Sequence, residues 1–284
     1  MINGENNQMT SVSPDLTGEI ALITGCAGLL GPVHADALIR CGTFVVVTDI
    51  DEERARETAH RLADEHGAHK VVGLRMDVTD HAGVAAVQRR VLDEHGCVGI
   101  LVNNAAIDPK VDSEGGVREM SRFEHFPLAQ WEEQIRVGLT GAFVCCQIFG
   151  TAMAAKGRGV IVNIASDLSV IGPDQRLYRR DGVADGEQPV KPVSYSVTKT
   201  GLVGLTRYLA TYWADKGVRV NALSPGGVFA GQPPVFVDRL QQLIPMQRMA
   251  VPNEYVGAIQ FLCSDASRYM TGQNLVIDGG RSVW

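Results

Sequence analysis

The chain has 284 residues and a formal net charge of −6, from 26 Lys and Arg against 32 Asp and Glu. This mildly acidic balance argues against binding a phosphate backbone, so we expect no nucleic-acid partner. No apolar run approaches the roughly 20 residues that span a bilayer, and residues 1–18 lack a basic region followed by an apolar one. We therefore expect a cytoplasmic protein with no membrane partner, in which residues 1–17 form a flexible polar leader and residues 18–284 a single domain.

The cysteines and histidines show no spacing typical of a metal site. None of the six cysteines forms a CxxC pair, and the seven histidines contain no HExxH pair. We predict free, mostly buried thiols in a reducing compartment and no protein-bound metal.

Short β-branched runs alternate with longer helical patterns along the chain. The runs predict strands at residues 20–24, 44–49, 71–75, 100–102, 160–164, 218–221 and 274–277. The patterns between them predict helices at residues 29–41, 51–65, 82–94, 128–155, 196–215 and 253–263. Strands that are apolar on both faces and alternate with helices indicate an α/β fold, a doubly wound seven-stranded parallel sheet of the Rossmann type with helices on both faces.

Three stretches interrupt the alternation, at residues 108–127, 167–194 and 226–252. Each follows the carboxyl end of a predicted strand, which is where ligands bind in open α/β sheets. Because loops of this length inside a compact domain are usually functional, we expect them to surround the site.

A glycine-rich turn joins the first strand to the first helix and contains Gly25, Gly28 and Gly31. Such a turn lets backbone N–H groups approach a pyrophosphate at the helix N-terminus. Asp49 ends the second strand, where a carboxylate accepts hydrogen bonds from ribose hydroxyls and repels a 2′-phosphate. No Arg or Lys lies in the turn or directly after Asp49. The sequence therefore predicts NAD rather than NADP, although on position alone Asp49 could instead be a helix cap or a solvated strand end.

Polar residues also follow the third and fourth strands, in Met76-Asp77-Val78 and Asn103-Asn104-Ala105-Ala106. With the glycine turn and Asp49, these motifs make the chain similar to the short-chain dehydrogenase/reductase family from about Leu16 to Gly280. The resemblance implies that Asp77 meets the adenine ring and that Asn103 to Ala106 steady the sheet and line the cofactor. It implies cofactor contacts from Gly25, Gly28, Leu30, Gly31, Asp49, Ile50, Asp77, Val78, Asn104, Ala105, Tyr195, Lys199, Pro225, Gly226 and Val228.

The glycine turn departs from the family spacing. The usual pattern, Thr-Gly followed by three residues and then Gly-x-Gly, would place a glycine at Leu29, whereas here Gly28 lies one position earlier. We expect the phosphate loop still to close, with altered donor geometry.

A second group of residues is suited to proton transfer. Tyr195 and Lys199 are four residues apart and share one face of the predicted helix, and a cation near a phenol lowers the phenol's pKa toward the working range. Ser166 ends the fifth strand, where its hydroxyl can orient a carbonyl. The family resemblance implies the same catalytic roles: Tyr195 as acid/base, Lys199 as its tuner and ribose binder, and Ser166 as substrate orienter.

The family often adds an Asn in a Val-Asn-Leu-x-Gly context, and the matching residue here is Gly138. In the family this Asn supports a water-linked proton path to the lysine. Glycine keeps the backbone carbonyl but loses the side chain. We hypothesise that activity persists with an altered relay.

Ser166 and Tyr195 are separated by a long polar insertion of mixed charge, residues 171–193. It reads either as a substrate lid with hydrogen-bonding groups, or as a solvated flap or subunit contact.

The glycine turn, this insertion and the Ser-Pro-Gly-Gly stretch at residues 224–227 resemble oxidoreductases of bacterial surface-sugar pathways. We therefore expect an NAD-dependent oxidoreductase acting on a small-molecule secondary alcohol or ketone, such as a sugar-like polyol. The alternatives are a reductase of a small ketone or cyclic polyol and a non-catalytic NAD sensor or scaffold. The resemblance also implies a homo-oligomer, a tetramer or dimer.

Overall fold

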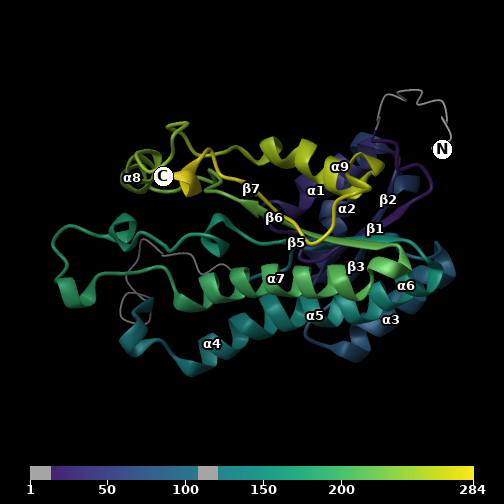
Figure 1. Ribbon diagram of the computed structural model, residues 1–284, viewed down its shortest axis with the longest axis horizontal. Helices are drawn as coiled ribbons and strands as arrows, with labels where there is room; N and C mark the ends of the chain where they lie inside the picture. Colours follow the sequence, from purple (N-terminus) through teal and green to yellow (C-terminus); the bar gives the residue numbers. More distant parts are fainter. Residues whose placement is uncertain (1–13, 108–120) are drawn as a thin grey trace, which may run out of the picture.

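A computed structural model describes residues 14–107 and 121–284 and contains one seven-stranded parallel sheet (Figure 1). The strand order is β3-β2-β1-β4-β5-β6-β7. The strands are β1 (Ile20–Ile23), β2 (Phe44–Asp49), β3 (Val71–Arg75), β4 (Ile100–Asn103), β5 (Gly159–Ile164), β6 (Val218–Pro225) and β7 (Asn274–Ile277). This order, with β1 and β4 as central neighbours, is the doubly wound arrangement, so the predicted fold class is confirmed.

Both faces of the sheet are covered because both sets of alternating side chains are apolar. In β1, Ala21 and Ile23 join one buried cluster, and Leu22 joins the other. All three are fully buried. Successive side chains of a strand point to opposite faces, so a strand that is apolar throughout requires helices on each side.

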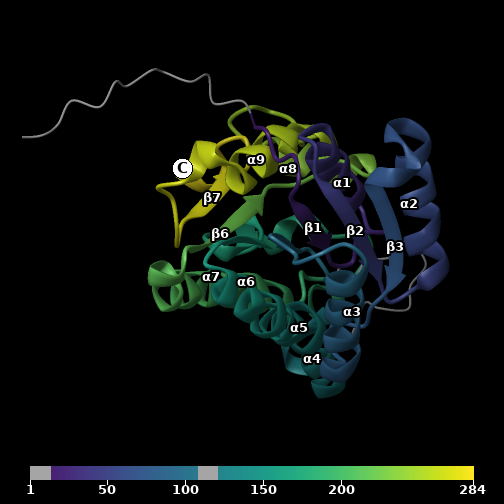
Figure 2. The ribbon, with the colours of Figure 1, turned by 90° about the vertical axis from the view of Figure 1, so that its right-hand side faces the viewer.

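The helices form two layers around the sheet (Figures 1 and 2). On one face lie α1 (Gly31–Arg40), α2 (Glu52–His66) and α9 (Val256–Cys263), whose buried residues belong to one cluster. On the other lie α3 (His81–Glu94), α7 (Val193–Tyr212) and the long helical run of residues 128–156. Each helix agrees with the predicted one to within a few residues, and α7 begins three residues earlier than expected, so that Tyr195 is already helical.

The long run is not one uniform helix. It comprises α4 (Leu128–Ile135), α5 (Gly141–Cys145) and α6 (Thr151–Lys156), joined by π-helical turns at Arg136–Thr140 and Cys146–Gly150. Contrary to the sequence expectation, this run is long and apolar enough to cross a membrane by length and composition. Half of its most apolar window is buried within the protein, the pattern of a helix that packs on a sheet core.

The structure departs from the sequence expectation in two further places. Residues 226–252 contain an unpredicted helix, α8 (Pro234–Gln241). Leu16, assigned to the flexible leader, is buried in the core, and its N–H donates to the Cys41 carbonyl at 2.7 Å. Residues 1–13 and the 108–120 part of the first long loop lie outside the described residues. All six cysteines are free thiols, and five are buried, as predicted.

Candidate functional site

The predicted site residues lie along the carboxyl edge of the sheet. Asp49 ends β2, Asn103 ends β4, Ser166 lies two residues beyond β5 and Pro225 ends β6. The parallel register puts these strand ends on one edge, beside the point where the strand order reverses between β1 and β4.

The glycine turn is shaped by close backbone contacts. Gly25 has a φ of +57°, and a Cβ there would lie 2.7 Å from the Ala105 Cα. A Cβ at Gly31 would collide with the Cys26 carbonyl oxygen. Gly28, the shifted glycine, has only the Gly25 carbonyl near its missing Cβ, and its N–H donates to that oxygen at 3.2 Å. Close backbone packing therefore requires glycine at Gly25 and Gly31, whereas the Gly28 N–H is used within the turn itself.

The segment after β4 locks onto this turn. The Thr24 hydroxyl oxygen accepts hydrogen bonds from the Asn104 and Ala105 N–H groups, both at 3.0 Å. The Asn104 side-chain amide donates to the carbonyls of Thr24 at 3.1 Å and Gly25 at 2.9 Å. These four bonds hold the predicted cofactor residues Gly25, Asn104 and Ala105 as one rigid unit.

Asp49 faces the glycine turn but is already hydrogen-bonded within the protein. One carboxylate oxygen accepts from the Ala27 N–H at 3.1 Å and the other from the Asp51 N–H at 3.2 Å. Arg54 of α2 donates to the Ala27 carbonyl at 2.7 Å. The sequence argument overlooked this arginine because it lies five residues after Asp49, a distance that one turn of α2 closes.

Apolar side chains stay exposed around this edge and would suit the flat rings of a dinucleotide. Leu29 is 51% exposed, Ile50 60% and Ile107 38%. The residues therefore fit the predicted cofactor, with the glycine turn at the phosphates and exposed apolar side chains beside it.

Two other predicted cofactor contacts, Asp77 and Val78, also make contacts within the protein, and their cofactor roles stay predictions. Asp77 holds its own turn, since one carboxylate oxygen accepts from the Thr79 N–H at 2.9 Å and hydroxyl at 2.8 Å. Val78 is 6% exposed and packs where a Cβ on Gly141 would reach it. The Val78 side chain thus belongs to the core, and only its backbone could meet a ligand.

Tyr195 and Lys199 line one small cavity on α7, together with Ala106, Ile107, Gln134, Gly138 and Thr198. The Lys199 ammonium donates to the Ile164 carbonyl at 2.8 Å and lies 5.7 Å from the Tyr195 ring centroid. A second ammonium, that of Lys191 in the insertion, lies 3.8 Å from the same centroid. Tyr195 therefore has two ammonium groups near its ring, and the sequence analysis did not foresee that of Lys191.

Ser166 is 6% exposed and makes two hydrogen bonds next to the strand end. Its hydroxyl donates to the Asp167 carboxylate at 2.9 Å and accepts from the Leu168 N–H at 3.2 Å. The Lys199 ammonium binds the carbonyl of Ile164, which ends β5 two residues before Ser166. The end of β5 therefore helps to position both Lys199 and Ser166.

The segment after β6 is also closely packed. A Cβ on Gly226 would lie 2.7 Å from the Asp278 Cα, and the Gly226 N–H donates to the Ile277 carbonyl at 2.8 Å. Val228 pairs with Ala250 in an isolated parallel bridge. The turn at Pro225, Gly226 and Val228 is therefore held at the same edge of the sheet by contacts with the Ile277 carbonyl and with Ala250.

The insertion of residues 171–193 is anchored to α8. Leu177 is buried in an apolar cluster with Leu240, Ile244 and Met249, and Tyr178 packs on Phe236 with ring centroids 5.6 Å apart. Although most of its residues are polar, the insertion is seated on apolar side chains, and it reaches the site through Lys191. The insertion is therefore packed on the fold, and its role as a substrate lid or a subunit contact stays a prediction.

Asp36, Glu65 and His66 bring three potential metal-binding atoms within 4.8 Å of one another where α2 ends. His66 and Arg40 already pair with Asp36, so this group has an ordinary explanation as an ion-pair network. The expectation of no bound metal stays a prediction.

Family comparisons cover nearly the whole chain. The model of the family described as short chain dehydrogenase matches residues 19–178, and that described as enoyl-(acyl carrier protein) reductase matches residues 183–282.

Individual relatives agree. The chain is 35% identical over 274 residues to a D-threitol dehydrogenase of Mycolicibacterium smegmatis, covering 94% of both chains. It is 30% identical to an NAD-dependent glycerol dehydrogenase of Listeria innocua, covering 95% of this chain and 96% of the relative. Among solved structures, a gluconate 5-dehydrogenase from Burkholderia cenocepacia in complex with NADP and tartrate matches with a TM-score of 0.82 at 30% identity, covering 95% and 98% of the two chains.

Proposed function

Because the chain belongs to the short-chain dehydrogenase/reductase family, we propose that it is an NAD-dependent oxidoreductase that interconverts a secondary alcohol of a polyol and the corresponding ketone. The observation that carries this proposal is the shared cavity of Tyr195 and Lys199, with the lysine fixed on the carbonyl of Ile164, two residues before Ser166. A positioned phenol beside a fixed ammonium is equipped for proton transfer at neutral pH.

A bound nicotinamide would supply the hydride acceptor and donor. The glycine turn and the segments after β4 and β6 would hold this cofactor. Tyr195 takes the proton of the substrate hydroxyl during oxidation and returns it during reduction. Lys199 stabilises the charged form of the phenol, and Ser166 orients the substrate oxygen.

Asp49 supports NAD as the cofactor, because its carboxylate lies against the glycine turn and would repel a 2′-phosphate. The glycerol dehydrogenase relative is named as NAD-dependent. Arg54 and the NADP complex of the structural relative favour the other cofactor. We propose NAD because the carboxylate is buried against the turn, whereas Arg54 is more exposed.

A small polyol is supported by the relatives named for threitol and glycerol and by the polar side chains of the insertion. A substrate from a surface-sugar pathway stays a prediction, as does the cytoplasmic location.

The proposal is tested with a panel of polyols, sugars, sugar acids, cyclic alcohols and small ketones, monitored by NADH absorbance. We expect turnover of at least one short polyol, and a loss of about 100-fold or more in kcat for Tyr195→Phe. The matched control is Tyr269→Phe, since this tyrosine is fully exposed. NADH binding without turnover across the whole panel would favour the sensor over the enzyme.

A further inference from the structure

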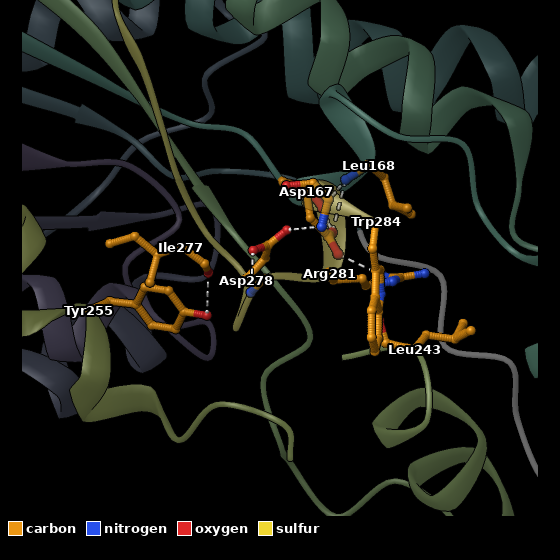
Figure 3. Close-up of polar contacts among 11 residues, drawn as sticks. Asp167, Leu168, Leu243, Tyr255, Ile277, Asp278, Arg281 and Trp284 are labelled. Atoms are coloured by element: carbon orange, nitrogen blue, oxygen red, sulfur yellow. Dashed lines mark hydrogen bonds and ion pairs between the residues drawn. The ribbon is translucent and has the colours of Figure 1, made fainter. Parts of the chain in front are cut away.

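The segment after β7 reaches back to the residue next to Ser166. Arg281 donates to the Asp167 carboxylate at 2.7 Å, and these two side chains are only 8% and 4% exposed (Figure 3). The other Asp167 oxygen accepts from the Ser166 hydroxyl at 2.9 Å. The carboxylate of a buried ion pair therefore binds the Ser166 hydroxyl, which is proposed to orient the substrate.

Arg281 lies in a turn that hydrogen bonds to the Asp278 side chain hold in place. The Asp278 carboxylate accepts from the Gly280 N–H at 2.9 Å and from the Ser282 N–H at 2.8 Å. Gly279 and Gly280 have φ values of +67° and +90°, a backbone conformation that favours glycine. The Asp-Gly-Gly sequence thus forms a turn whose next side chain points at Asp167.

Asp167 also fixes the backbone of the residue that follows it. The carboxylate oxygen that binds Ser166 accepts the Leu168 N–H at 2.9 Å, and the same N–H lies 3.2 Å from the Ser166 hydroxyl oxygen. In the described contacts, these bonds use the Ser166 hydroxyl proton and one lone pair. The second lone pair remains to accept a hydrogen bond from a substrate hydroxyl other than the one whose proton Tyr195 takes.

From these contacts we infer that Arg281 and Asp167 are positioning residues that hold the Ser166 hydroxyl in one orientation for the substrate. This inference rests on the proposed function of Ser166. Arg281 neutralises the Asp167 carboxylate, which would otherwise be a buried, unpaired charge, and holds it in place. The carboxylate in turn fixes the orientation of the Ser166 hydroxyl by accepting its hydrogen bond. Neither residue needs to touch the substrate.

The neighbouring ionisable groups do not supply this role. Burial raises the pKa of Tyr255 to about 12, so its phenol stays protonated and donates to the Ile277 carbonyl at 3.3 Å. Asp278 is engaged by the backbone of the turn. The cation paired with Asp167 in the described contacts is that of Arg281.

The test is a double-mutant cycle on the full chain. Arg281→Met is made alone and together with Ser166→Ala, and kcat/KM is measured for oxidation of the best alcohol. We expect Arg281→Met to lower kcat/KM by about 10- to 100-fold alone, the usual range for a hydrogen bond to a charged group. In the Ser166→Ala background we expect less than about a threefold further loss, because the hydroxyl to be positioned is absent. Arg281→Lys should recover part of the loss.

A structural control separates positioning from stability. Arg219 is a part-buried arginine of β6 that donates to the Leu262 and Ser264 carbonyls and does not contact Ser166 in the described structure. Arg219→Met should lower Tm while changing kcat by less than about twofold. Equal losses of kcat/KM for Arg281→Met in both backgrounds would mean that the ion pair is only structural and would overturn the inference.

A second readout does not depend on turnover. The Tm losses of Ser166→Ala and Arg281→Met should not add in the double variant, because both act on Asp167. Additive losses would reject the inference. Failure of the wild type to turn over any substrate would reject the proposed function and leave this thermal test of the positioning contact intact.

Discussion

Gly138 lies at a position where the surrounding residues leave no room for a side chain. It lies in the π turn between α4 and α5, at the cavity of Tyr195 and Lys199. A Cβ at this position would lie 2.6 Å from the Thr198 Cγ2 of α7. The close approach of the two helices therefore occupies the space that the family's asparagine would need. π turns of this kind are often found near functional sites.

We predict that Gly138→Ala lowers the free energy of unfolding by about 1–3 kcal/mol, because Thr198 is β-branched and cannot easily turn away. Activity should fall by less than in Tyr195→Phe. The control is Gly204→Ala on α7, where no described atom lies within 4 Å of the missing Cβ. Urea unfolding and steady-state kinetics report the two effects. A loss of kcat as large as that of Tyr195→Phe would place Gly138 in the proton path.

We expect Asp49 and Arg54 to act in opposite directions on cofactor choice. We predict that the wild type uses NAD⁺ better than NADP⁺ and that Asp49→Ser shifts the ratio of kcat/KM values toward NADP⁺ by about tenfold or more, since the repulsion between close charges is removed. Arg54→Ala in the same background should reverse part of that shift. A wild-type preference for NADP⁺ would show that Arg54 outweighs the carboxylate.

At the scale of elements, the sequence predicted the strands well because each is a short β-branched run ending at polar residues, as in β2 with Asp49. It missed α8, which has prolines at its start and only one buried residue, Leu240. It also missed both π turns, since an extra residue per turn hardly alters apolar spacing over a long helix. The turn between α4 and α5 in particular places Gly138, so its packing could not be read from periodicity.

The predicted site residues could be identified because each lies within or next to a local motif. Tyr195 and Lys199 share one helical turn, and Ser166 follows a strand end. The contact of Arg281 with Asp167 joins residues 114 positions apart, and no local pattern records it. Lys191 above the Tyr195 ring likewise depends on the path of the insertion.

Helix α1 carries a buried imidazole that makes stability depend on pH. His34 is fully buried, neither ring nitrogen has a hydrogen-bond partner in the described structure, and burial lowers its pKa from 6.5 to about 4. Between these two values the unfolded chain binds a proton that the folded chain excludes. The contribution of His34 to the free energy of unfolding is therefore fully present above pH 6.5 and is lost as the pH drops toward 4.

We predict that this single group costs the wild type about 3 kcal/mol of unfolding free energy between pH 7 and pH 4. His34→Leu should remove that part of the slope, because it keeps an apolar side chain in the core without a titrating ring. Urea unfolding at several pH values measures the slope. If the variant and the wild type lose stability in parallel, His34 does not carry the effect.

At the scale of the whole molecule, α7 carries Tyr195 and Lys199, two of the three predicted catalytic residues, and an exposed aromatic pair. Tyr208 and Tyr212 are 63% and 61% exposed and stack with ring centroids 5.8 Å apart. Large exposed aromatic side chains are typical of contact surfaces. We propose that α7 packs against a second copy of the chain in a homo-oligomer.

Tyr208→Glu together with Tyr212→Glu should lower the mass in solution, since charges at the centre of an interface oppose association. Light scattering after size exclusion measures this mass. Leu92→Glu on α3 is the control, because Leu92 is also exposed, at 46%, but lies on another helix. An unchanged mass of the double variant would place the interface elsewhere.

The seating of the insertion on α8 has a consequence for engineering. Within residues 171–193, Leu177 packs with Leu240, Ile244 and Met249, which come from a segment more than 45 residues later in the chain. A chimera that receives only the insertion would acquire the polar groups without the apolar floor that holds them. If the insertion sets substrate choice, as we predict, an exchange of specificity between relatives requires both segments to be transplanted together.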